Sequence, residues 1–272
     1  MLIFIRQKIS NQKNRHESVS KNLGRVPILV SVRSPEEAYL ASKSGADFVD
    51  AKEPSAGALG KLPISKIKEI ISTLRFVNFS GKVTATYGDN IEKIVDFNSH
   101  NFFSYFFLGL NAIKIGFDAR GLTSSEKVVL KLVDSYNEII FNNKNKEIET
   151  EPSQLIPVLM VDKGLNIDFV EFLMSTSISN NIFGIMIDTK YKMNSNLFDI
   201  IDLNTLNKLF KKIDSFNLPY GIAGSLNKSN SEVIKQLQPS WAGYRGGVCS
   251  GDRKGDLSEK KIRLIIKSLE VT

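Results

Sequence analysis

Two lysines and two aspartates stand where short apolar runs end. Asp50 and Lys52 close the run DFVDAK, Lys114 lies inside NAIKIG, and Asp188 ends IFGIMID. A lysine inside an apolar run is costly unless it is paired or used. An ammonium held near another cation and partly removed from water has a lowered pKa, and the neutral amine can attack a carbonyl carbon. These residues therefore predict imine chemistry on an aldehyde or ketone.

Two lysines that face one cavity can divide this chemistry between them. One would form the imine and the other would move protons, with the aspartates orienting both. The residue types do not decide which lysine does which. The alternative is that Lys52 and Lys114 form structural ion pairs with Asp50 and Asp188. Four such groups at the ends of three different runs favour catalysis.

Glycine-rich turns end two later runs, PYGIAG and WAGYRG. Gly224 and Ser225 stand at the end of the first, and Gly246 and Gly247 at the end of the second. Glycine lets backbone N–H groups approach phosphate oxygens, and a serine hydroxyl can donate as well. We interpret these four residues as phosphate-binding, with ordinary tight turns as the alternative. The run 251–256 is expected to be a mobile loop that could close over a substrate.

The chain alternates short apolar segments with longer amphipathic ones, which is typical of βα units and a parallel sheet. The residues Ser34-Pro35-Glu36-Glu37 predict a capping box with proline at the first helical position, and Gly45 ends that helix. Apolar spacing predicts further helices, including 64–74, 123–141 and 262–269. Strands are expected at 26–31, 47–52, 82–87, 111–116, 155–162, 182–188, 219–224 and 241–246.

Eight strands and their helices predict an α/β fold, a single (β/α)8 barrel of the TIM-barrel kind. A doubly wound open sheet is the alternative, but no G-x-G-x-x-G follows the first strand. The length of 272 residues fits one barrel, so we expect one catalytic domain over 26–272. Catalytic groups of such barrels lie at the carboxyl ends of the strands. Asp50 and Lys52 can both face the barrel axis if Ala51 faces the helices.

Most of the net charge of +7 lies in the first 26 residues, where six basic residues and one acidic residue give +5. The remainder of the chain carries only +2, which gives little reason to expect nucleic-acid binding. Residues 1–25 are expected to form a disordered basic leader. A non-catalytic nucleic-acid binder recruited through this leader is the rival hypothesis. Deleting residues 1–25 would abolish that function and leave an enzyme's activity largely intact.

Composition narrows the available chemistry. The two histidines, His16 and His100, do not lie at strand ends, so acid–base work falls to lysine, aspartate, glutamate or tyrosine. Cys249, the single cysteine, excludes an internal disulfide and a cysteine cluster for zinc, and without a neighbouring base it is expected to be a passive thiol. No apolar run approaches 18 residues. We expect a cytoplasmic protein without membrane association, metal or cofactor.

The segment DAKEP at 50–54 is followed by GALG at 57–60, in register with a later Arg-Gly-Gly segment, and this combination is highly specific. Together with the segments given at the end of this paragraph, it resembles the (5-formylfuran-3-yl)methyl phosphate synthase family. The resemblance covers about residues 27–269. The supporting segments are ILVSVRSPEEAYLASKSGADFV, TATYGD, IKIGF, IDTKYK, GIAGSL and GYRGGVCSGDRKG.

The resemblance implies a lyase that condenses two molecules of glyceraldehyde 3-phosphate into a furan aldehyde phosphate. One phosphate and water are lost, and the product serves the biosynthesis of methanofuran-type cofactors. The lysine matching Lys52 forms the Schiff base in that family, and the lysine matching Lys114 is the proton acceptor. Asp50, Asp188 and Lys192 match further polar positions of the family's site. The expected partner is a small phosphorylated aldehyde, and we expect a homo-oligomer.

The chain departs from the family pattern in two places. The basic leader has no counterpart in the shorter members, and Met193-Asn194 replaces the usual Asp-Gly after Lys192. Asparagine can adopt the left-handed conformation that glycine would take, so we expect the loop to keep its shape. Another Schiff-base aldolase or a sugar-phosphate isomerase on the same barrel is the second enzyme hypothesis.

Overall fold

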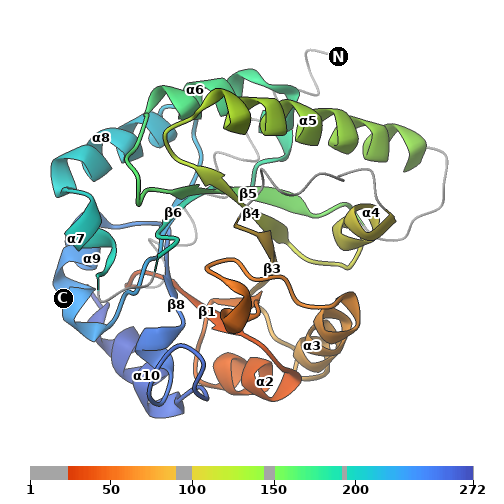
Figure 1. Cartoon of the computed structure of the whole chain (residues 1–272). Helices are drawn as coiled ribbons and strands as arrows, with labels where there is room; N and C mark the ends of the chain where they lie inside the picture. Colours follow the sequence, from red (N-terminus) through yellow and green to blue (C-terminus); the bar gives the residue numbers. More distant parts are fainter. Residues whose placement is uncertain (1–23, 90–99, 144–150, 192–194, 272) are drawn as a thin grey trace.

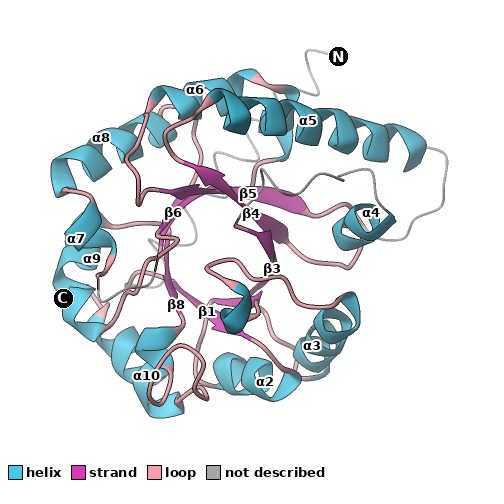
Figure 2. Ribbon diagram, viewed as in Figure 1, coloured by secondary structure: helices cyan, strands magenta, loops and turns pink. Residues whose placement is uncertain are grey.

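The protein folds as a closed ring of parallel strands surrounded by helices. A computed structural model describes residues 24–89, 100–143, 151–191 and 195–271. Eight parallel strands, β1 to β8, follow one another around the ring in chain order, and β8 pairs with β1. Figure 1 and Figure 2 show the molecule viewed along the barrel axis, with the strands at the centre and the helices outside. The prediction of a (β/α)8 barrel is confirmed.

Each predicted strand is present, and several are shorter than their apolar runs. The sixth strand begins at Ile185, and Ile182 forms only an isolated bridge to Leu155. The strands are Ile28–Val32 (β1), Phe48–Ala51 (β2), Lys82–Gly88 (β3), Ala112–Asp118 (β4), Gln154–Met160 (β5), Ile185–Asp188 (β6), Tyr220–Ile222 (β7) and Trp241–Tyr244 (β8).

The helices lie between the strands along the chain. No helix in the described ranges combines the length and the apolar character needed to cross a bilayer. The α-helices are Pro35–Lys43 (α2), Ile64–Phe76 (α3), His100–Phe106 (α4), Thr123–Asn143 (α5), Asp168–Ser175 (α6), Leu197–Ile200 (α7), Leu203–Asp214 (α8), Ser231–Leu237 (α9) and Glu259–Ser268 (α10). Short 3-10 helices occur at Pro54–Ala56 (η1), Ser177–Asn181 (η3), Lys228–Asn230 (η4) and Gly246–Val248 (η5).

Helix α2 begins as predicted, with one difference in its cap. The Ser34 hydroxyl accepts a hydrogen bond from the backbone N–H of Glu37, and Pro35 is the first helical residue. In a capping box, the Glu37 side chain would also accept a hydrogen bond from the backbone N–H of Ser34. The Glu37 carboxylate accepts instead from the N–H of Arg33 and pairs with Arg245 beyond β8. A charge partner from the end of the neighbouring strand β8 has therefore replaced half of the predicted local cap.

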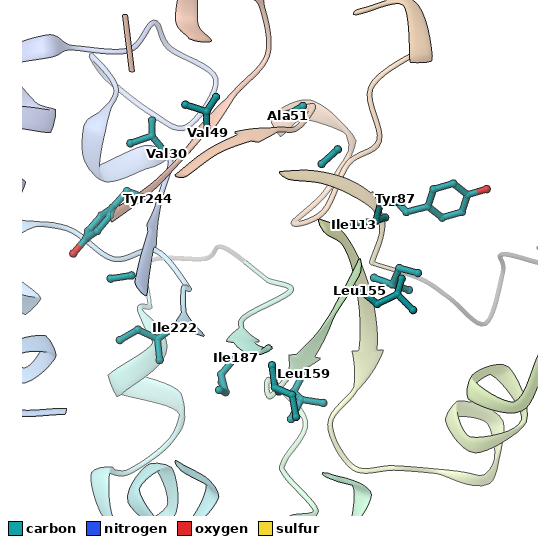
Figure 3. Packing of buried hydrophobic residues seen from close by; sticks show 14 of the residues in the cluster. Val30, Val49, Ala51, Tyr87, Ile113, Leu155, Leu159, Ile187, Ile222 and Tyr244 are labelled. Carbon is teal, nitrogen blue, oxygen red and sulfur yellow. The ribbon is translucent and has the colours of Figure 1, made fainter. Parts of the chain in front are cut away.

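Strand alternation divides the apolar residues into an outer and an inner core. The outer core lies between strands and helices and contains Ala51, Ile113 and Ile187 (Figure 3). The inner core fills the barrel, where the Phe48 ring lies 5.5 Å from that of Trp241 between ring centroids. These aromatic rings fill the interior and leave the carboxyl ends of the strands for polar groups.

Arg25 belongs to the folded body, although its charge places it with the basic leader in the sequence. Its guanidinium binds both carboxylate oxygens of Asp47, at 2.7 and 2.9 Å. Asp47 also accepts a hydrogen bond from the backbone N–H of Ile28. The backbone of Arg25 forms an isolated antiparallel β-bridge with Glu270. The predicted disorder of the leader concerns residues 1–23, which lie outside the described residues. A truncation that removes the leader should therefore end at residue 23.

Gly221 on β7 lies directly against the indole of Trp241, and an alanine there has no room. A Cβ at Gly221 would lie 2.0 Å from the indole Nε1. Gly221→Ala is expected to lower the free energy of unfolding by about 1–3 kcal/mol, as overpacking does. Urea denaturation measures this loss. Trp241→Phe removes the pyrrole edge, so the same alanine should cost less in that background, and equal losses in both backgrounds would contradict the steric explanation.

Candidate active site

An ion pair inside the barrel joins two of the four groups singled out in the sequence. Lys114 Nζ lies 2.6 Å from Asp50 Oδ2, and the two side chains are only 2% and 0% exposed. Asp50 comes from β2 and Lys114 from β4, on either side of β3. The register of the sheet aligns Asp50 with Thr84 and Lys114 with Thr86. The barrel thus brings together residues that are 64 positions apart.

The Asp50 carboxylate collects donors from three other strands. Thr84 donates its hydroxyl to Oδ1 at 2.7 Å, and Ser31 donates to Oδ2 at 3.1 Å. Lys114 completes the set. Hydrogen bonds to a carboxylate stabilise its charged form and fix its orientation. The Lys114 amine is therefore held in one place, an arrangement expected both of a structural ion pair and of an aspartate that orients a catalytic lysine.

Lys52 lies on the inward side of the barrel, immediately after β2. Its backbone N–H donates to Val32 of β1 at 2.9 Å, which continues the pairing of the two strands. Ala51 belongs to the outer core (Figure 3), so Lys52 and Asp50 share the opposite, inward side. The Lys52 residue is 6% exposed. The condition that the sequence set for an inward Lys52 is met.

Asp188 ends β6 and is buried, as expected for the carboxyl end of a strand. Its Oδ1 accepts from the N–H of Thr189 at 2.7 Å. Burial lowers the pKa of Arg253, and the negative charge of Asp188 opposes that shift. Lys192, which the sequence placed in the same site, lies outside the described residues together with Met193 and Asn194. Its part in the site stays a prediction.

Residues 53–60, which we call the cap, follow Lys52 and cover the barrel interior (orange in Figure 1). The N–H of Glu53 donates to the carbonyl of Gly60 at 2.9 Å and closes the segment on itself. Leu59 is fully buried and belongs to the inner core together with Met160. The Thr86 hydroxyl donates to the Gly60 carbonyl at 2.6 Å. The segment that makes the sequence motif specific thus follows Lys52 directly and places Leu59 beside Gly116, two residues after Lys114.

A cavity of about 450 Å³ lies where β7 and β8 end. Its volume suits a small ligand. Three of the four residues predicted to bind phosphate line it, while Gly224 lies beside Thr189 and Leu197 with a φ of +117°. Within the described residues, its lining includes neither Lys52 nor Lys114. The lining residues are Ser225, Asn227, Gly246, Gly247, Asp252, Arg253 and Lys261.

The two glycines after β8 differ in what they allow. A Cβ at Gly247 would lie 2.4 Å from the carbonyl oxygen of Leu226, so only glycine lets the two loops of the cavity come this close. A Cβ at Gly246 would meet Arg253 at 3.6 Å, an ordinary contact. Ser225 adopts a left-handed conformation with a φ of +51°. Gly247 therefore has a packing role whether or not a phosphate binds.

Arg245 fastens the glycine-rich loop that follows β8. Its buried guanidinium binds the Glu37 carboxylate at 2.5 and 3.1 Å. It also donates to the carbonyls of Ser31, Arg253 and Gly255, at 3.0, 2.8 and 2.9 Å. The loop expected to be mobile is thus tied to β1 and α2 at several points. Arg245 is held by a carboxylate, whereas Arg253 and Lys261 of the cavity donate to the backbone carbonyls of Gly57 and Cys249.

Sequence reasoning missed the two cations of the cavity, Arg253 and Lys261, and the hydroxyls of Ser31 and Thr84. The two hydroxyls could have been predicted, because they occupy inward positions on the strands that flank β2, and inward positions follow a period of two. The two cations follow no periodicity and gave no such signal.

Burial raises the pKa of the Cys249 thiol, which fits a passive thiol.

A family model described as 4-HFC-P synthase matches residues 28–266. The chain belongs to this family. The finding confirms the resemblance in the sequence. A relative named (5-formylfuran-3-yl)methyl phosphate synthase, from Methanosarcina acetivorans, is 27% identical over 256 residues and covers 90% of this chain and 99% of its own. The relative of the same name from Methanocaldococcus jannaschii is 25% identical over 254 residues, with 89% and 97% covered.

Solved structures of other enzymes share the barrel of this 4-HFC-P synthase family member. Phosphoribosyl anthranilate isomerase from Thermotoga maritima aligns with a TM-score of 0.58 at 16% identity, covering 91% of this chain and all of its own. The 3-hexulose-6-phosphate synthase from Salmonella typhimurium gives 0.55 at 14% identity, with 89% and 98% covered. At these identities the likeness concerns the fold alone.

The buried pair makes a prediction about stability. Asp50→Ala leaves the Lys114 amine buried without its carboxylate and is expected to lower the free energy of unfolding by about 3–5 kcal/mol. The double variant Asp50→Ala with Lys114→Met should regain much of this loss, because neither charge of the pair remains in the barrel. Chemical denaturation of the single and double variants measures both. Glu259→Gln, which breaks the exposed pair with Arg263 on α10, is the control and should unfold like the parent. A double variant as unstable as the single would contradict this account.

Proposed function

We propose that this chain condenses two molecules of glyceraldehyde 3-phosphate into (5-formylfuran-3-yl)methyl phosphate, as a lyase in the biosynthesis of a methanofuran-type cofactor. The observation that carries the proposal is the inward Lys52 immediately beyond the buried pair of Lys114 and Asp50. Relatives that align over nearly their whole length are named for this product. Together they support imine chemistry on a phosphorylated aldehyde.

Lys52 is the nucleophile of the proposed reaction. Its neutral amine adds to the aldehyde carbon, and loss of water leaves an imine. The protonated imine withdraws electrons, so the proton on the neighbouring carbon becomes acidic. Lys114 gives a proton to the departing hydroxyl as the imine forms, and its neutral amine, held beside Asp50 at 2.6 Å, then removes the acidic proton from carbon and delivers it later. The pair found in the barrel is therefore a positioned proton carrier in this mechanism.

The enamine carbon then bonds to the aldehyde carbon of the second molecule. Elimination of phosphate and water and closure of the ring through a hydroxyl oxygen give the furan, and hydrolysis of the imine frees Lys52. Two triose phosphates contain the atoms of one furan phosphate, one phosphate and two waters, so no external oxidant is needed. Aromaticity of the ring makes the sequence hard to reverse. Asp188 and Lys192 complete the polar surroundings of the reacting carbons.

The phosphate of a bound triose is assigned to the turns after β7 and β8. Gly224, Ser225, Gly246 and Gly247 are the residues proposed to hold it through backbone N–H groups and the serine hydroxyl. The cavity of about 450 Å³ at this place supports the assignment, as do the two cations that line it. The loop packing of Gly247 is compatible with this role.

Reductive trapping tests the assignment of Lys52. Incubation with glyceraldehyde 3-phosphate and borohydride is expected to leave an adduct on Lys52, mapped by mass spectrometry. Lys52→Met should give no adduct. Lys114→Met should still be trapped, but furan formation should fall by about 10²-fold or more, because a positioned proton carrier is lost. Lys66→Met, on the exposed side of α3, is the matched control. Labelling at Lys114 in the parent protein would overturn the roles.

Product analysis separates the proposal from another Schiff-base enzyme on the same barrel. A conjugated furan aldehyde absorbs in the ultraviolet, and an aldolase or a sugar-phosphate isomerase would form none. An adduct on Lys52 without this absorbance would therefore keep the imine and exclude the furan product.

A further inference from the structure

Arg253 joins the phosphate cavity to the cap. Its side chain lines the cavity beside Gly246. Its Nη2 donates a hydrogen bond to the carbonyl oxygen of Gly57 at 2.7 Å. Its own carbonyl accepts from Arg245 Nε at 2.8 Å, so its backbone is anchored. One flexible cationic side chain on a fixed backbone thus spans the distance between the cavity and the cap.

The charge of Arg253 is only partly compensated in this arrangement. Burial lowers its pKa, and Asp188, Asp89 and Asp252 act in the opposite direction, while Arg245 adds to the lowering. The hydrogen bond from its Nη2 goes to the neutral carbonyl of Gly57. A phosphate dianion in the cavity offers a charged acceptor, and hydrogen bonds between two charged groups are about twice as strong as neutral ones. A phosphate would therefore compete with Gly57 for the guanidinium.

The cap has to yield before a substrate can reach the lysines. Lys52 is 6% exposed and Lys114 is 2% exposed, and Leu59 of the cap is buried in the inner core beside Gly116, two residues after Lys114. The cap is held by Arg253 at Gly57 and by Asp89, whose carboxylate accepts from the N–H of Ala58 at 2.8 Å. The bond from Arg253 is the one of these two that a ligand in the cavity can remove directly.

We propose that Arg253 is a ligand of the substrate phosphate, and that its transfer from the Gly57 carbonyl to the phosphate loosens the cap over Lys52. The proposal rests on the proposed function for the identity of the substrate. It gives the enzyme a means of selection, because an aldehyde without a phosphate leaves Arg253 on the cap. Lys261 lines the same cavity and adds a second positive charge.

Inorganic phosphate is the probe that tests this, with Arg253→Gln as the variant. Titration calorimetry measures phosphate affinity, and hydrogen–deuterium exchange of peptides covering residues 53–60 measures opening of the cap. In the parent protein, saturating phosphate should speed cap exchange by about tenfold, because one hydrogen bond to a charged group is removed. Arg253→Gln should bind phosphate roughly tenfold or more weakly, and its cap should exchange fast with or without phosphate.

Matched variants separate this effect from loss of charge and from misfolding. Arg120→Gln removes a guanidinium that pairs with Asp118 at the end of β4, and it should behave like the parent protein in both measurements. Exchange in α8 reports whether Arg253→Gln is folded. Arg253→Lys keeps the charge and should retain part of the phosphate affinity.

Two results would overturn the proposal: an unchanged phosphate affinity in a folded Arg253→Gln, or phosphate binding to the parent protein that leaves cap exchange unchanged or slows it. Neither measurement requires turnover or an imine. A failure to trap Lys52 would therefore sink the proposed function and leave this test intact, and the reverse also holds.

Discussion

A carboxylate shut away from water needs enough donors to replace its hydration, and the barrel is arranged to provide them for Asp50. Its donors come from β1, β3 and β4, so four neighbouring strands meet at one pair of oxygen atoms. Each of these strands carries at least one polar inward residue between apolar outward ones. The outer core holds the strands in register, and the register brings the donors to the carboxylate. The position of the Lys114 amine thus depends on packing on the outer side of the sheet.

The cap has the opposite character, because it is irregular backbone that fills a hydrophobic space. Leu59 and Ala58 complete the inner core from above, where a barrel strand would supply no further side chain. The bonds that hold the cap come from the ends of β3 and from the loop after β8. The cap is therefore attached to both sides of the barrel mouth, and residues from the last quarter of the chain act on a segment next to Lys52.

Much of this could be predicted from sequence because it follows period-two or helical repetition. The strands and the start of α2 are of this kind. So is the inward direction of Asp50 and Lys52, which was inferred from a small apolar residue, Ala51, between them. Contacts between distant loops could not be predicted, because no periodicity links them. The pairing of Glu37 with Arg245 replaced a local capping box, and Arg253 reached Gly57 across 196 positions. In both cases a charged side chain bonds to a group that is distant in sequence and close in the folded barrel.

The ion pair between Glu37 and Arg245 also closes the ring, because α2 follows the first strand and Arg245 follows the last. Until the ribosome has released the final strand, Glu37 keeps its pair with Arg33 at 3.3 Å but lacks the buried guanidinium of Arg245. Barrel closure therefore has to wait for β8, and a polypeptide that stops short of this strand leaves the edge of β1 unpaired and Glu37 without Arg245.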